Sequence, residues 1–562
     1  ILSGLQDRGI QNITIATGYR ADELVAHIDR QFPSLDIQYV NNEHYETTNN
    51  IHSMSLALGK MQLCDDLILI ESDLIYEPQV LDRLLASPYK NVALVDRYRS
   101  GMDGTVVTLD GSKVITQVIP PTLQPSDFSF IDKYKTLNIY RFSAEFVDTT
   151  LTRLLTYYAE TFDDNCYYEL ILGILIYMQQ AEIHAEVING ERWAEVDDPN
   201  DLRKAELLFS PARRYQALAN GWGGLWGADV VDFNFIRNMY FPPPALLSEL
   251  RHNLPALLQN YGSQQSILNE KLAWALQRDV GMVHALAGAS QCYPWLHDWF
   301  GDKKVLIPEP TFGEYARMFP GAARYRDAPG IDWHDLQVSA TTADVVVFVN
   351  PNNPTGSVIP TERIVALARV WPDKTIIVDE SFIDFSDEPS IVDWLEHGDV
   401  SNIIVIKILS KGLGRPGIRL GGLFTTDREI AERVRTVTPI WNLSSVTESF
   451  LEILLKNRPA MENSYDETIR DREGLRKLLV DCPMVDVVFP SAANFLLARL
   501  RVSAAESASL AGRLLDKTNI LVKDASGKFS DGRGYWRLAV RTPVDHELLA
   551  DGMAAVVSDM LS

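Results

Sequence analysis

The sequence predicts an α/β protein with two open sheets, one in each half of the chain. Short apolar runs alternate with helical patterns throughout, and the runs of the second half lack period-two alternation, as parallel strands buried on both faces do. A stretch rich in glycine and tryptophan at 220–227 separates the two series. At 562 residues the chain is also too long for one hydrophobic core. We therefore expect domains at 1–209 and 228–562, joined by a linker at 210–227.

The elements of the first half are expected in a simple order. A helix over Ile1–Asp7 comes first, a helix near 201–208 closes the half, and the strands between them lie at 12–18, 66–73, 91–95 and 105–109. The chain opens inside a helical pattern, so we expect a segment of the native protein to precede it. The strands of the second half are expected at 304–307, 344–349, 375–378 and 402–408.

Charge and cysteine content exclude several partner classes. The 52 basic and 75 acidic residues give a net charge of -23, which repels nucleic acid and anionic membrane surfaces. A local basic pocket would still admit small anionic substrates. The four cysteines form no CxxC pair, which argues against a disulfide framework and a zinc site and indicates a cytoplasmic protein. The longest apolar run, 170–178, is far shorter than a membrane span, and no secretory signal is present.

Polar residues follow three of the expected strands in the second half. Lys411 comes after the strand 402–408, Asp379 ends the strand 375–378, and Asn353 follows the strand 344–349. The carboxyl ends of such strands are where open α/β sheets bind ligands. Taken singly, each residue has a plain alternative: an exposed lysine, a helix-capping carboxylate and a proline–asparagine turn.

Together these segments resemble a known family. Asn350-Pro-Asn-Asn353-Pro-Thr-Gly356, then Asp379-Glu380, then Ser410-Lys411 with Gly417-Ile-Arg419-Leu-Gly421 downstream, resemble the class I/II aminotransferases of the fold-type I pyridoxal phosphate (PLP) enzymes. Histidinol-phosphate aminotransferase and threonine-phosphate decarboxylase are the most similar branches. The resemblance implies a large and a small subdomain over 228–562, and PLP as cofactor.

The resemblance also implies a role for each matching residue. Lys411 would bond the cofactor and move protons, Asp379 would pair with the ring nitrogen, and Arg537 would bind the substrate carboxylate. The remaining cofactor contacts would come from Asn353 on the ring oxygen, Phe312 stacked on the ring, and Ser410, Arg419, Ala289, Ser290 and Gln291 at the phosphate. Tyr261 would reach the phosphate of a neighbouring subunit, which implies a homodimer.

Two positions depart from the family pattern. Phe382 stands where a tyrosine is usual, so one hydrogen bond to the ring oxygen is absent. Ile408 stands where many members have serine or threonine, which removes a phosphate contact. Because related enzymes decarboxylate on the same scaffold, the sequence leaves transamination and decarboxylation both open.

Two aspartates in the first half could hold a metal ion. Asp73 ends the strand 66–73, and Asp197 lies in Trp193-Ala-Glu-Val-Asp197. Two carboxylates from separate strand ends suit Mg²⁺ that bridges nucleotide phosphates. The alternative is two capping or solvated aspartates.

The sequence around these aspartates resembles that of the sugar-phosphate and choline-phosphate nucleotidylyltransferases. The segments are Thr17-Gly-Tyr-Arg, Tyr45-Glu-Thr-Thr-Asn-Asn50, Lys135-Thr-Leu-Asn and Glu195-Val-Asp197. The resemblance implies a Rossmann-like nucleotidyltransferase domain over 1–209, with Mg²⁺ on Asp73 and Asp197 and the substrate lined by Tyr45, Asn50 and Lys135. The glycine-rich loop that cradles the nucleotide in that family is not in this sequence, and we expect it in the preceding segment.

The two halves together predict a bifunctional enzyme. The first would transfer a nucleotide, CMP from CTP, to a phosphate or phosphonate, and the second would carry out PLP chemistry on an amino acid or aminophosphonate. Two alternatives stay open: the second half decarboxylates its substrate, or the first half binds a nucleotide without turnover.

Overall fold

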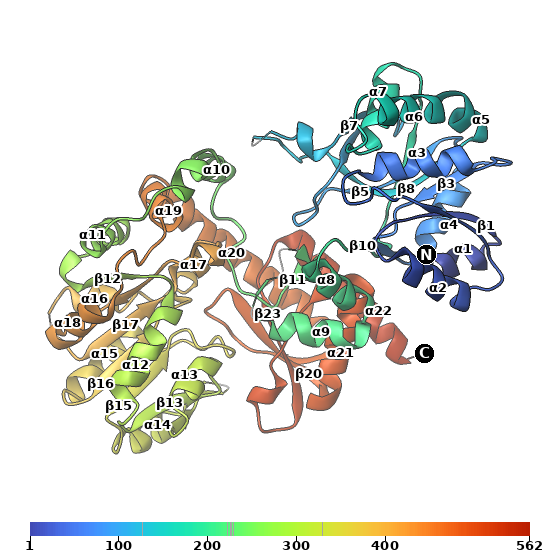
Figure 1. The fold of residues 1–562 in the computed structure, drawn as a ribbon. Helices are drawn as coiled ribbons and strands as arrows, with labels where there is room; N and C mark the ends of the chain where they lie inside the picture. The colour runs from blue at the N-terminus through green and yellow to red at the C-terminus, as the bar shows by residue number, and fades with distance from the viewer. Residues whose placement is uncertain are drawn as a thin grey trace. The chain divides into compact units, whose positions relative to one another are not determined.

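The computed structural model describes residues 1–125, 127–221, 223–224, 227–228, 230–328, 330–398 and 400–561. The chain divides into two compact units, the first comprising Ile1–Arg214 with Gly223–Asp229 and the second Tyr215–Trp222 with Val230–Ser562 (Figure 1). The segment expected as a linker over 210–227 begins with a helix, α9 (Pro211–Asn220). Trp222, Leu225 and Trp226 of the same segment lie outside the described residues.

The first unit is built on a mixed sheet. Its strands run in the order β7-β6-β8-β5-β9, with β3 also paired to β8, and β8 is antiparallel to β3, β5 and β6. Two smaller sheets join β1 to β2 in parallel and β10 to β4 in antiparallel fashion. The strands are β1 (Asn12–Thr17), β2 (Asp36–Asn41), β3 (Leu67–Ile70), β4 (Leu74–Tyr76), β5 (Val92–Arg97), β6 (Val106–Leu109), β7 (Ile115–Ile119), β8 (Tyr134–Phe142), β9 (His184–Val187) and β10 (Trp193–Glu195).

This pairing differs from the Rossmann-like sheet expected from sequence. Parallel pairs are present at β1–β2, which α2 connects, and at β5–β9, whereas β6 and β7 form a hairpin, whose short connection enforces antiparallel pairing. Apolar side chains on both faces of the sheet are covered by helices. The helices are α1 (Leu2–Asp7), α2 (Ala21–Gln31), α3 (Asn50–Lys60), α4 (Pro78–Ala86), α5 (Ala144–Phe146), α6 (Thr152–Thr161), α7 (Glu169–Tyr177) and α8 (Pro199–Phe209).

The second unit contains a seven-stranded sheet in the order β12-β18-β17-β16-β15-β13-β14. The five strands from β17 to β14 are parallel, and β18 is antiparallel to both of its neighbours. The strands are β12 (Val283–Leu286), β13 (Val305–Glu309), β14 (Ala323–Arg326), β15 (Val345–Val349), β16 (Thr375–Asp379), β17 (Ile403–Lys407) and β18 (Gly421–Phe424). The parallel strands expected in this half at 304–307, 344–349, 375–378 and 402–408 are therefore present.

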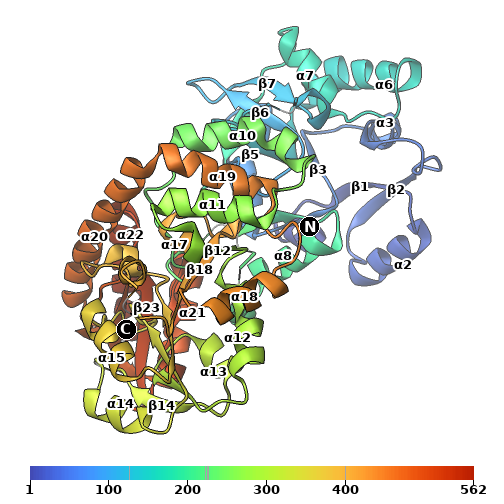
Figure 2. The same cartoon turned by 90° about the vertical axis from the view of Figure 1, so that its left-hand side faces the viewer.

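Helices cover both faces of the large sheet, which explains why its strands read as continuous apolar runs. Alternate residues of β15 and β16 enter two separate cores, one packed by α11, α14, α15 and α19 and the other by α12, α13 and α18 (Figure 2). The helices are α10 (Pro244–Leu258), α11 (Gln265–Leu276), α12 (Cys292–Phe300), α13 (Gly313–Met318), α14 (Trp333–Ala340), α15 (Thr361–Val370), α16 (Val392–Leu395), α17 (Leu409–Gly412), α18 (Arg428–Val437) and α19 (Ser445–Lys456).

A smaller antiparallel sheet in the order β19-β20-β23-β22 completes the second unit. It packs on α20, α21 and α22 through its own apolar core, and β11 pairs in parallel with β21 nearby. These elements are β11 (Val231–Asp232), α20 (Arg458–Val480), β19 (Val485–Val488), β20 (Phe495–Ser503), α21 (Ala504–Thr518), β21 (Ile520–Leu521), β22 (Lys523–Asp524), β23 (Arg533–Ala539) and α22 (Pro543–Leu561). Among the described helices of either unit, none combines the length and apolarity that crossing a bilayer requires.

Candidate active sites

Lys411 lies on the one-turn helix α17, directly after β17 at the carboxyl edge of the large sheet. Its backbone carbonyl accepts a hydrogen bond from Asn238 N at 3.1 Å, which fixes the turn. Burial, followed by the positive charges of Arg537 and Arg419, lowers the pKa of Lys411 to about 8. A lysine with such a pKa is a partly neutral amine near neutral pH, as a nucleophile or a proton carrier must be.

Asp379 is the last residue of β16 and is 2% exposed. One carboxylate oxygen accepts a hydrogen bond from the Tyr315 hydroxyl at 2.8 Å, and the other accepts from the Ser381 backbone N–H at 3.0 Å and from the Ser381 hydroxyl. Burial raises the pKa of Asp379, and these donors oppose that rise. The carboxylate is therefore oriented for a partner in the site.

Asn353 and Arg537 come together from different subdomains. Asn353 follows β15, and its side-chain oxygen accepts a hydrogen bond from Arg537 Nη1 at 2.9 Å. Arg537 Nη2 donates to the carbonyl of Asn234, while Arg537 Nε is buried without a hydrogen-bond partner among the described residues. The guanidinium is held in place and retains a free donor for an acceptor in the site.

A group of donors lies at the start of the helical turn that precedes α12. Arg419 Nη2 donates to Ser290 Oγ at 2.6 Å, and a Cβ at Gly288 would lie 2.8 Å from the same nitrogen. Gly288 also has φ +77, so no other residue would fit here without strain. Ser410 is fully buried, and its hydroxyl has no partner among the described residues. An orphaned buried hydroxyl beside an arginine and a glycine turn fits a phosphate group.

Three other residues predicted for this site, Ala289, Gln291 and Phe312, lie in the turn before α12 and at the start of α13. Ala289 and Gln291 lie in the same turn, but the Gln291 side chain accepts from Ala287 N at 2.8 Å and donates to Asn442 at 2.7 Å, so its role is to brace the turn. Phe312 caps α13, with its ring 6.3 Å from that of Tyr293.

Tyr261, Phe382 and Ile408 are the remaining positions of the second unit that the sequence singled out. Tyr261 is 76% exposed and stacks on Trp441 with ring centroids 4.4 Å apart. Phe382 is buried edge-on against Phe495, and Ile408 precedes α17.

Comparison with known proteins identifies the family of the second unit. Residues 237–552 match the family model described as aminotransferase class I and II. The chain belongs to the aminotransferase class I and II family. It is 30% identical to the CMP-5'-(3-aminopropyl)phosphonate synthase of Streptomyces rubellomurinus, over 99% of this chain and 89% of that protein. It is 26% identical to an L-serine phosphate decarboxylase of Campylobacter jejuni, over 54% of this chain and 82% of that protein.

Solved structures show the same fold for the aminotransferase unit. An L-threonine-O-3-phosphate decarboxylase from Porphyromonas gingivalis is 22% identical, covers 58% of this chain and all of its own, and superposes with a TM-score of 0.52. A histidinol-phosphate aminotransferase from Sinorhizobium meliloti, solved in complex with pyridoxal-5'-phosphate, is 18% identical, covers 62% of this chain and 95% of its own, and gives 0.53.

The residues around Lys411 fit PLP, the cofactor of the aminotransferase family. The orphaned Ser410 hydroxyl and the turn at Gly288 and Arg419 suit its phosphate, and the braced carboxylate of Asp379 suits its ring nitrogen. When bound, PLP withdraws electrons from the substrate carbon that carries the amine. The chain itself offers to that chemistry a braced arginine, Arg537, with one unpaired donor among the described residues, and a partly neutral amine, Lys411.

Two lysines that the sequence reasoning missed lie near the same arginine. Lys528 donates to the carbonyl of Thr311, next to Phe312, at 2.6 Å. Burial, followed by the charges of Arg537 and Lys523, lowers the pKa of Lys528 to about 8, and burial and Arg537 also lower that of Lys523. Arg537 thus lowers the pKa of both lysines, and Lys523 also lowers that of Lys528, so the three cations lie close enough together to attract an anion. They come from β22, β23 and the turn between them, and no local motif distinguishes them from solvated lysines.

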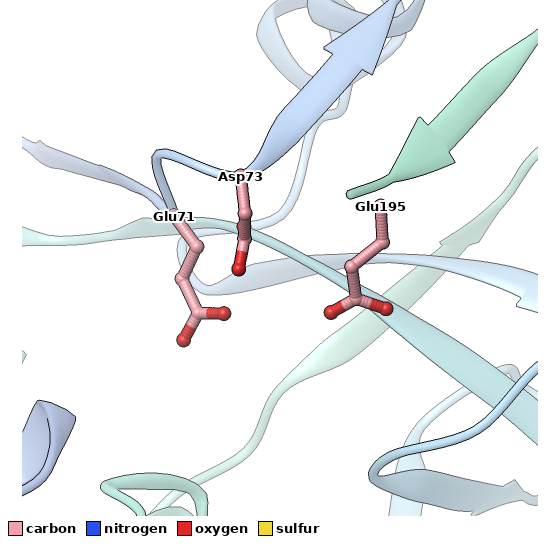
Figure 3. Close-up of side chains that lie close together, drawn as sticks. All are labelled: Glu71, Asp73 and Glu195. Atoms are coloured by element: carbon pink, nitrogen blue, oxygen red, sulfur yellow. The ribbon is translucent and has the colours of Figure 1, made fainter. Parts of the chain in front are cut away.

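Carboxylates converge in the first unit (Figure 3). Asp73 directly precedes β4, Glu195 ends β10, and these two strands pair so that Glu195 lies opposite Leu74. Oxygens of Glu71, Asp73 and Glu195 lie within 4.8 Å of one another, and the same holds for Asp103, Glu195 and Asp197. Asp73 and Asp197 are thus not in one triad, and Glu195 belongs to both.

The arrangement can hold a divalent cation. One oxygen of Asp73 is buried without a hydrogen-bond partner among the described residues, so it is available as a ligand. Burial, followed by the charges of Asp73 and Asp103, raises the pKa of Asp197, which indicates crowded negative charge. Oxygen ligands in such a cluster are what Mg²⁺ takes in proteins.

Of the predicted substrate residues in this unit, two lie beside the carboxylates. The nitrogen of Lys135 is 3.0 Å from Glu195 Oε2, and its side chain is 2% exposed and faces Gly104. Asn50 donates to Glu71 at 3.0 Å. Tyr45 instead packs on Gly18 and Tyr19 and donates to Glu46. None of its described contacts is with the two carboxylate triads that contain Glu195.

Proposed function

We propose that the chain is a bifunctional enzyme that activates a phosphonate or phosphate as a CMP conjugate and acts on its amino group. The supporting observation is the likeness over 99% of this chain to a protein named CMP-5'-(3-aminopropyl)phosphonate synthase. Such a product joins a nucleotide and an amine, so its synthesis needs both nucleotidyl transfer and amine chemistry. The two units carry an acidic and a basic site that suit these two tasks.

The first unit would act as a Mg²⁺-dependent nucleotidyltransferase on CTP. Asp73 and Asp197, bridged by Glu195, would hold the ion against the nucleotide phosphates. A phosphonate oxygen would attack the α-phosphorus in line and expel pyrophosphate, with catalysis through charge neutralisation and positioning. Lys135 and Asn50 would line the acceptor side.

The aminotransferase unit would bind an amino acid that carries a phosphonate or phosphate. Arg537 would pair with the carboxylate, and Lys523 and Lys528 would neutralise the distal anion. Lys411, with a pKa of about 8, would exchange a proton at the substrate carbon.

Decarboxylation is the second candidate for this unit, beside transamination. The 3-aminopropyl group in the relative's name has an amine on a carbon that bears no carboxylate, and another relative is named as a decarboxylase. In decarboxylation the bond from the substrate carbon to the carboxylate breaks, CO₂ leaves and a proton takes its place. In transamination the carbon loses a proton, its amino group passes to a second 2-oxo acid as acceptor, and the substrate becomes a 2-oxo acid.

One experiment addresses both activities. The full chain would be incubated with CTP, Mg²⁺, PLP, 2-amino-4-phosphonobutyrate and 2-oxoglutarate as amino acceptor, followed by mass spectrometry of the products and a CO₂ assay. We expect a CMP conjugate and pyrophosphate. Release of CO₂ would identify a decarboxylase, and a 2-oxo acid would identify an aminotransferase. If CTP binds but no phosphonate or phosphate acceptor gives pyrophosphate, the first unit is a nucleotide-binding module.

We also propose that the aminotransferase unit forms a homodimer. Tyr261 and Trp441 stack on the surface beside Ile440, with 76%, 55% and 76% of their areas exposed. Exposed apolar groups in contact are typical of interfaces, and the resemblance to the family implies a role for Tyr261 at the phosphate of the neighbouring subunit. Analytical ultracentrifugation should give a dimer, and Trp441→Ser should shift it towards monomer. A monomeric wild-type chain would contradict the proposal.

A further inference from the structure

The carboxylate of Asp379 in the aminotransferase unit is held by neutral hydrogen-bond donors. Asp379 is 2% exposed, and the residues that bind it, Tyr315 and Ser381, are 0% and 4% exposed. No cation among the described residues acts on the pKa of Asp379, and burial alone favours its neutral form. The hydrogen bonds from Tyr315 and Ser381 therefore support the negative charge at this position.

The other polar side chains near this carboxylate are neutral as well. Burial, followed by the charge of Asp379, raises the pKa of the Cys292 thiol and of the Tyr293 hydroxyl, both on α12. The same two causes, in the same order, raise the pKa of Tyr315. All three groups keep their protons at the pH of a cell, so Tyr315 donates to the carboxylate. A cation that pairs with Asp379 would thus be supplied by a ligand.

The two oxygens of Asp379 are not equivalent. Oδ1 accepts from the backbone N–H of Ser381 at 3.0 Å and from the Ser381 hydroxyl, whereas Oδ2 accepts from the Tyr315 hydroxyl at 2.8 Å. A carboxylate oxygen has about two acceptor positions. Both positions of Oδ1 are filled, and Oδ2 keeps one. A donor that enters the site would therefore bind Oδ2, beside the Tyr315 hydroxyl.

We propose that Tyr315 is a positioning residue, which directs Asp379 Oδ2 to the ring nitrogen of PLP and keeps the shared proton on that nitrogen. A donor already bound to Oδ2 makes this oxygen less basic, so the proton stays with the ring. A protonated ring withdraws electrons from the substrate carbon more strongly. This role requires PLP in the site, and it is the same for transamination and for decarboxylation.

Removal of the Tyr315 hydroxyl should change the colour of the bound cofactor as a function of pH. Lys411 would bond PLP through an imine, whose nitrogen takes up a proton as pH falls and changes the visible absorbance. A proton on the ring nitrogen draws electrons away and makes the imine nitrogen less basic. In Tyr315→Phe the shared proton moves towards Asp379, so the imine nitrogen becomes more basic. The midpoint of the absorbance change should rise by about one pH unit.

The test is a pH titration of the visible absorbance of the full chain with bound PLP, together with titration of the PLP-free protein with PLP. Tyr315→Phe should raise the midpoint as stated and weaken PLP binding about ten-fold. Ser381→Ala removes a donor from the other oxygen and should shift the midpoint by less than about half a unit.

Tyr325→Phe is the matched control. Tyr325 is also buried, at 1% exposed, and donates a single hydrogen bond, to the carbonyl of Val347 at 3.0 Å. Its loss tests the cost of removing a buried tyrosine hydroxyl from the same unit, and it should leave the midpoint unchanged.

A PLP analogue with a C–H group in place of the ring nitrogen separates the role of Tyr315 from a general effect on the pocket. The analogue offers no N–H to Asp379 Oδ2. Tyr315→Phe should therefore weaken its binding by less than about two-fold, against about ten-fold for PLP itself.

Three results would overturn the role of Tyr315: an unchanged midpoint in folded Tyr315→Phe, equal loss of affinity for PLP and for the analogue, or a larger shift in Ser381→Ala than in Tyr315→Phe. The last result would mean that Oδ1 meets the ring. Circular dichroism melting identifies any variant that fails to fold. If Tyr315→Phe does not fold, Ser381→Ala decides alone. A shift below about half a unit supports the assignment of Oδ2, and a larger one overturns it.

Discussion

The two candidate sites of this chain have opposite charge. In the first unit carboxylates gather around Glu195, with Lys135 as the cation in contact. In the second unit Arg537 lies near Lys411, and Lys523 and Lys528 lie near Arg537. A protein of net charge -23 thus contains a strongly basic pocket, so the charge of the chain as a whole does not predict which ligand each unit binds.

In both sites, like charges lie close together. Burial and neighbouring charges bring the pKa of Glu71 up to about 7 and that of Lys528 down to about 8. Near pH 7 Glu71 is then about half ionised and Lys528 is still mostly charged, and a ligand of opposite charge would stabilise the charged form of each. A substrate with an amine at one end and a phosphonate at the other would complement both sites. The opposite charges of the two sites therefore explain how both units could act on the same compound.

Replacing Lys411 should have the largest effect and should be confined to one site. Lys411→Ala removes the amine that bonds the cofactor and carries the proton, so we expect the PLP reaction to fall by at least about a thousand-fold. Loss of the cofactor's visible absorbance shift and of CO₂ or 2-oxo acid formation would measure it. Pyrophosphate release should be unchanged, and exposed Lys303→Ala serves as control. Retained PLP activity would refute the assignment.

Removing the metal should affect the other site. We expect EDTA to abolish pyrophosphate release and Asp73→Asn to lower it by roughly a hundred-fold, because a neutral amide binds Mg²⁺ less tightly than a carboxylate. The PLP reaction should continue in both cases. Asp148→Asn, on the surface of the same unit, is the control. An EDTA-resistant nucleotidyl transfer would contradict the metal site.

Much of the aminotransferase site could be predicted from the sequence, because Lys411, Asp379 and Asn353 each follow a buried parallel strand. The carboxyl ends of such strands meet at one edge, so proximity follows from topology. Lys523 and Lys528 could not be found in this way, since they reach the site from the small antiparallel sheet through long-range packing. In the first unit the sequence predicted β1, β3, β5 and β6 but missed the other strands and the pairing: β8 lies antiparallel to three strands that the sequence suggests as crossover neighbours.

Neutralising one lysine should have an intermediate effect. Lys528→Met keeps the aliphatic volume and removes the charge, so we expect KM for a phosphonate amino acid to rise about ten-fold with little change in kcat. A substrate without the distal anion should be unaffected. Deprotonation of Lys528 also removes its charge, so the affinity of the wild type for the phosphonate amino acid should fall as pH rises through about 8. In Lys528→Met this part of the pH profile should be flatter. Lys456→Met, exposed at the end of α19, is the control.

The smallest effect concerns folding stability in the first unit. The pKa of Glu71 rises from 4.5 in the unfolded chain to about 7 in the folded one, so the folded state binds more protons between these values and loses stability as pH increases through that window. Glu71→Gln lacks this dependence. From pH 5 to pH 8 the unfolding free energy should shift in favour of the variant by about 1 to 3 kcal/mol, measured by urea denaturation in EDTA. A constant difference across pH would contradict the shifted pKa.

Helix α9 has a practical consequence for dividing the protein. Its residue Tyr215 donates to the carbonyl of Val522 at 3.2 Å and accepts from the backbone N–H of Asp524 at 3.1 Å, and the carbonyl of Ala219 faces Lys523. The helix is thus fastened to β22, the strand that supplies Lys523. Cutting the gene at codon 228, where the sequence alone suggests a boundary, would strip this brace from the second unit. Expression of that unit should begin at or before Pro211, and a version starting at 228 should bind phosphonate substrates more weakly.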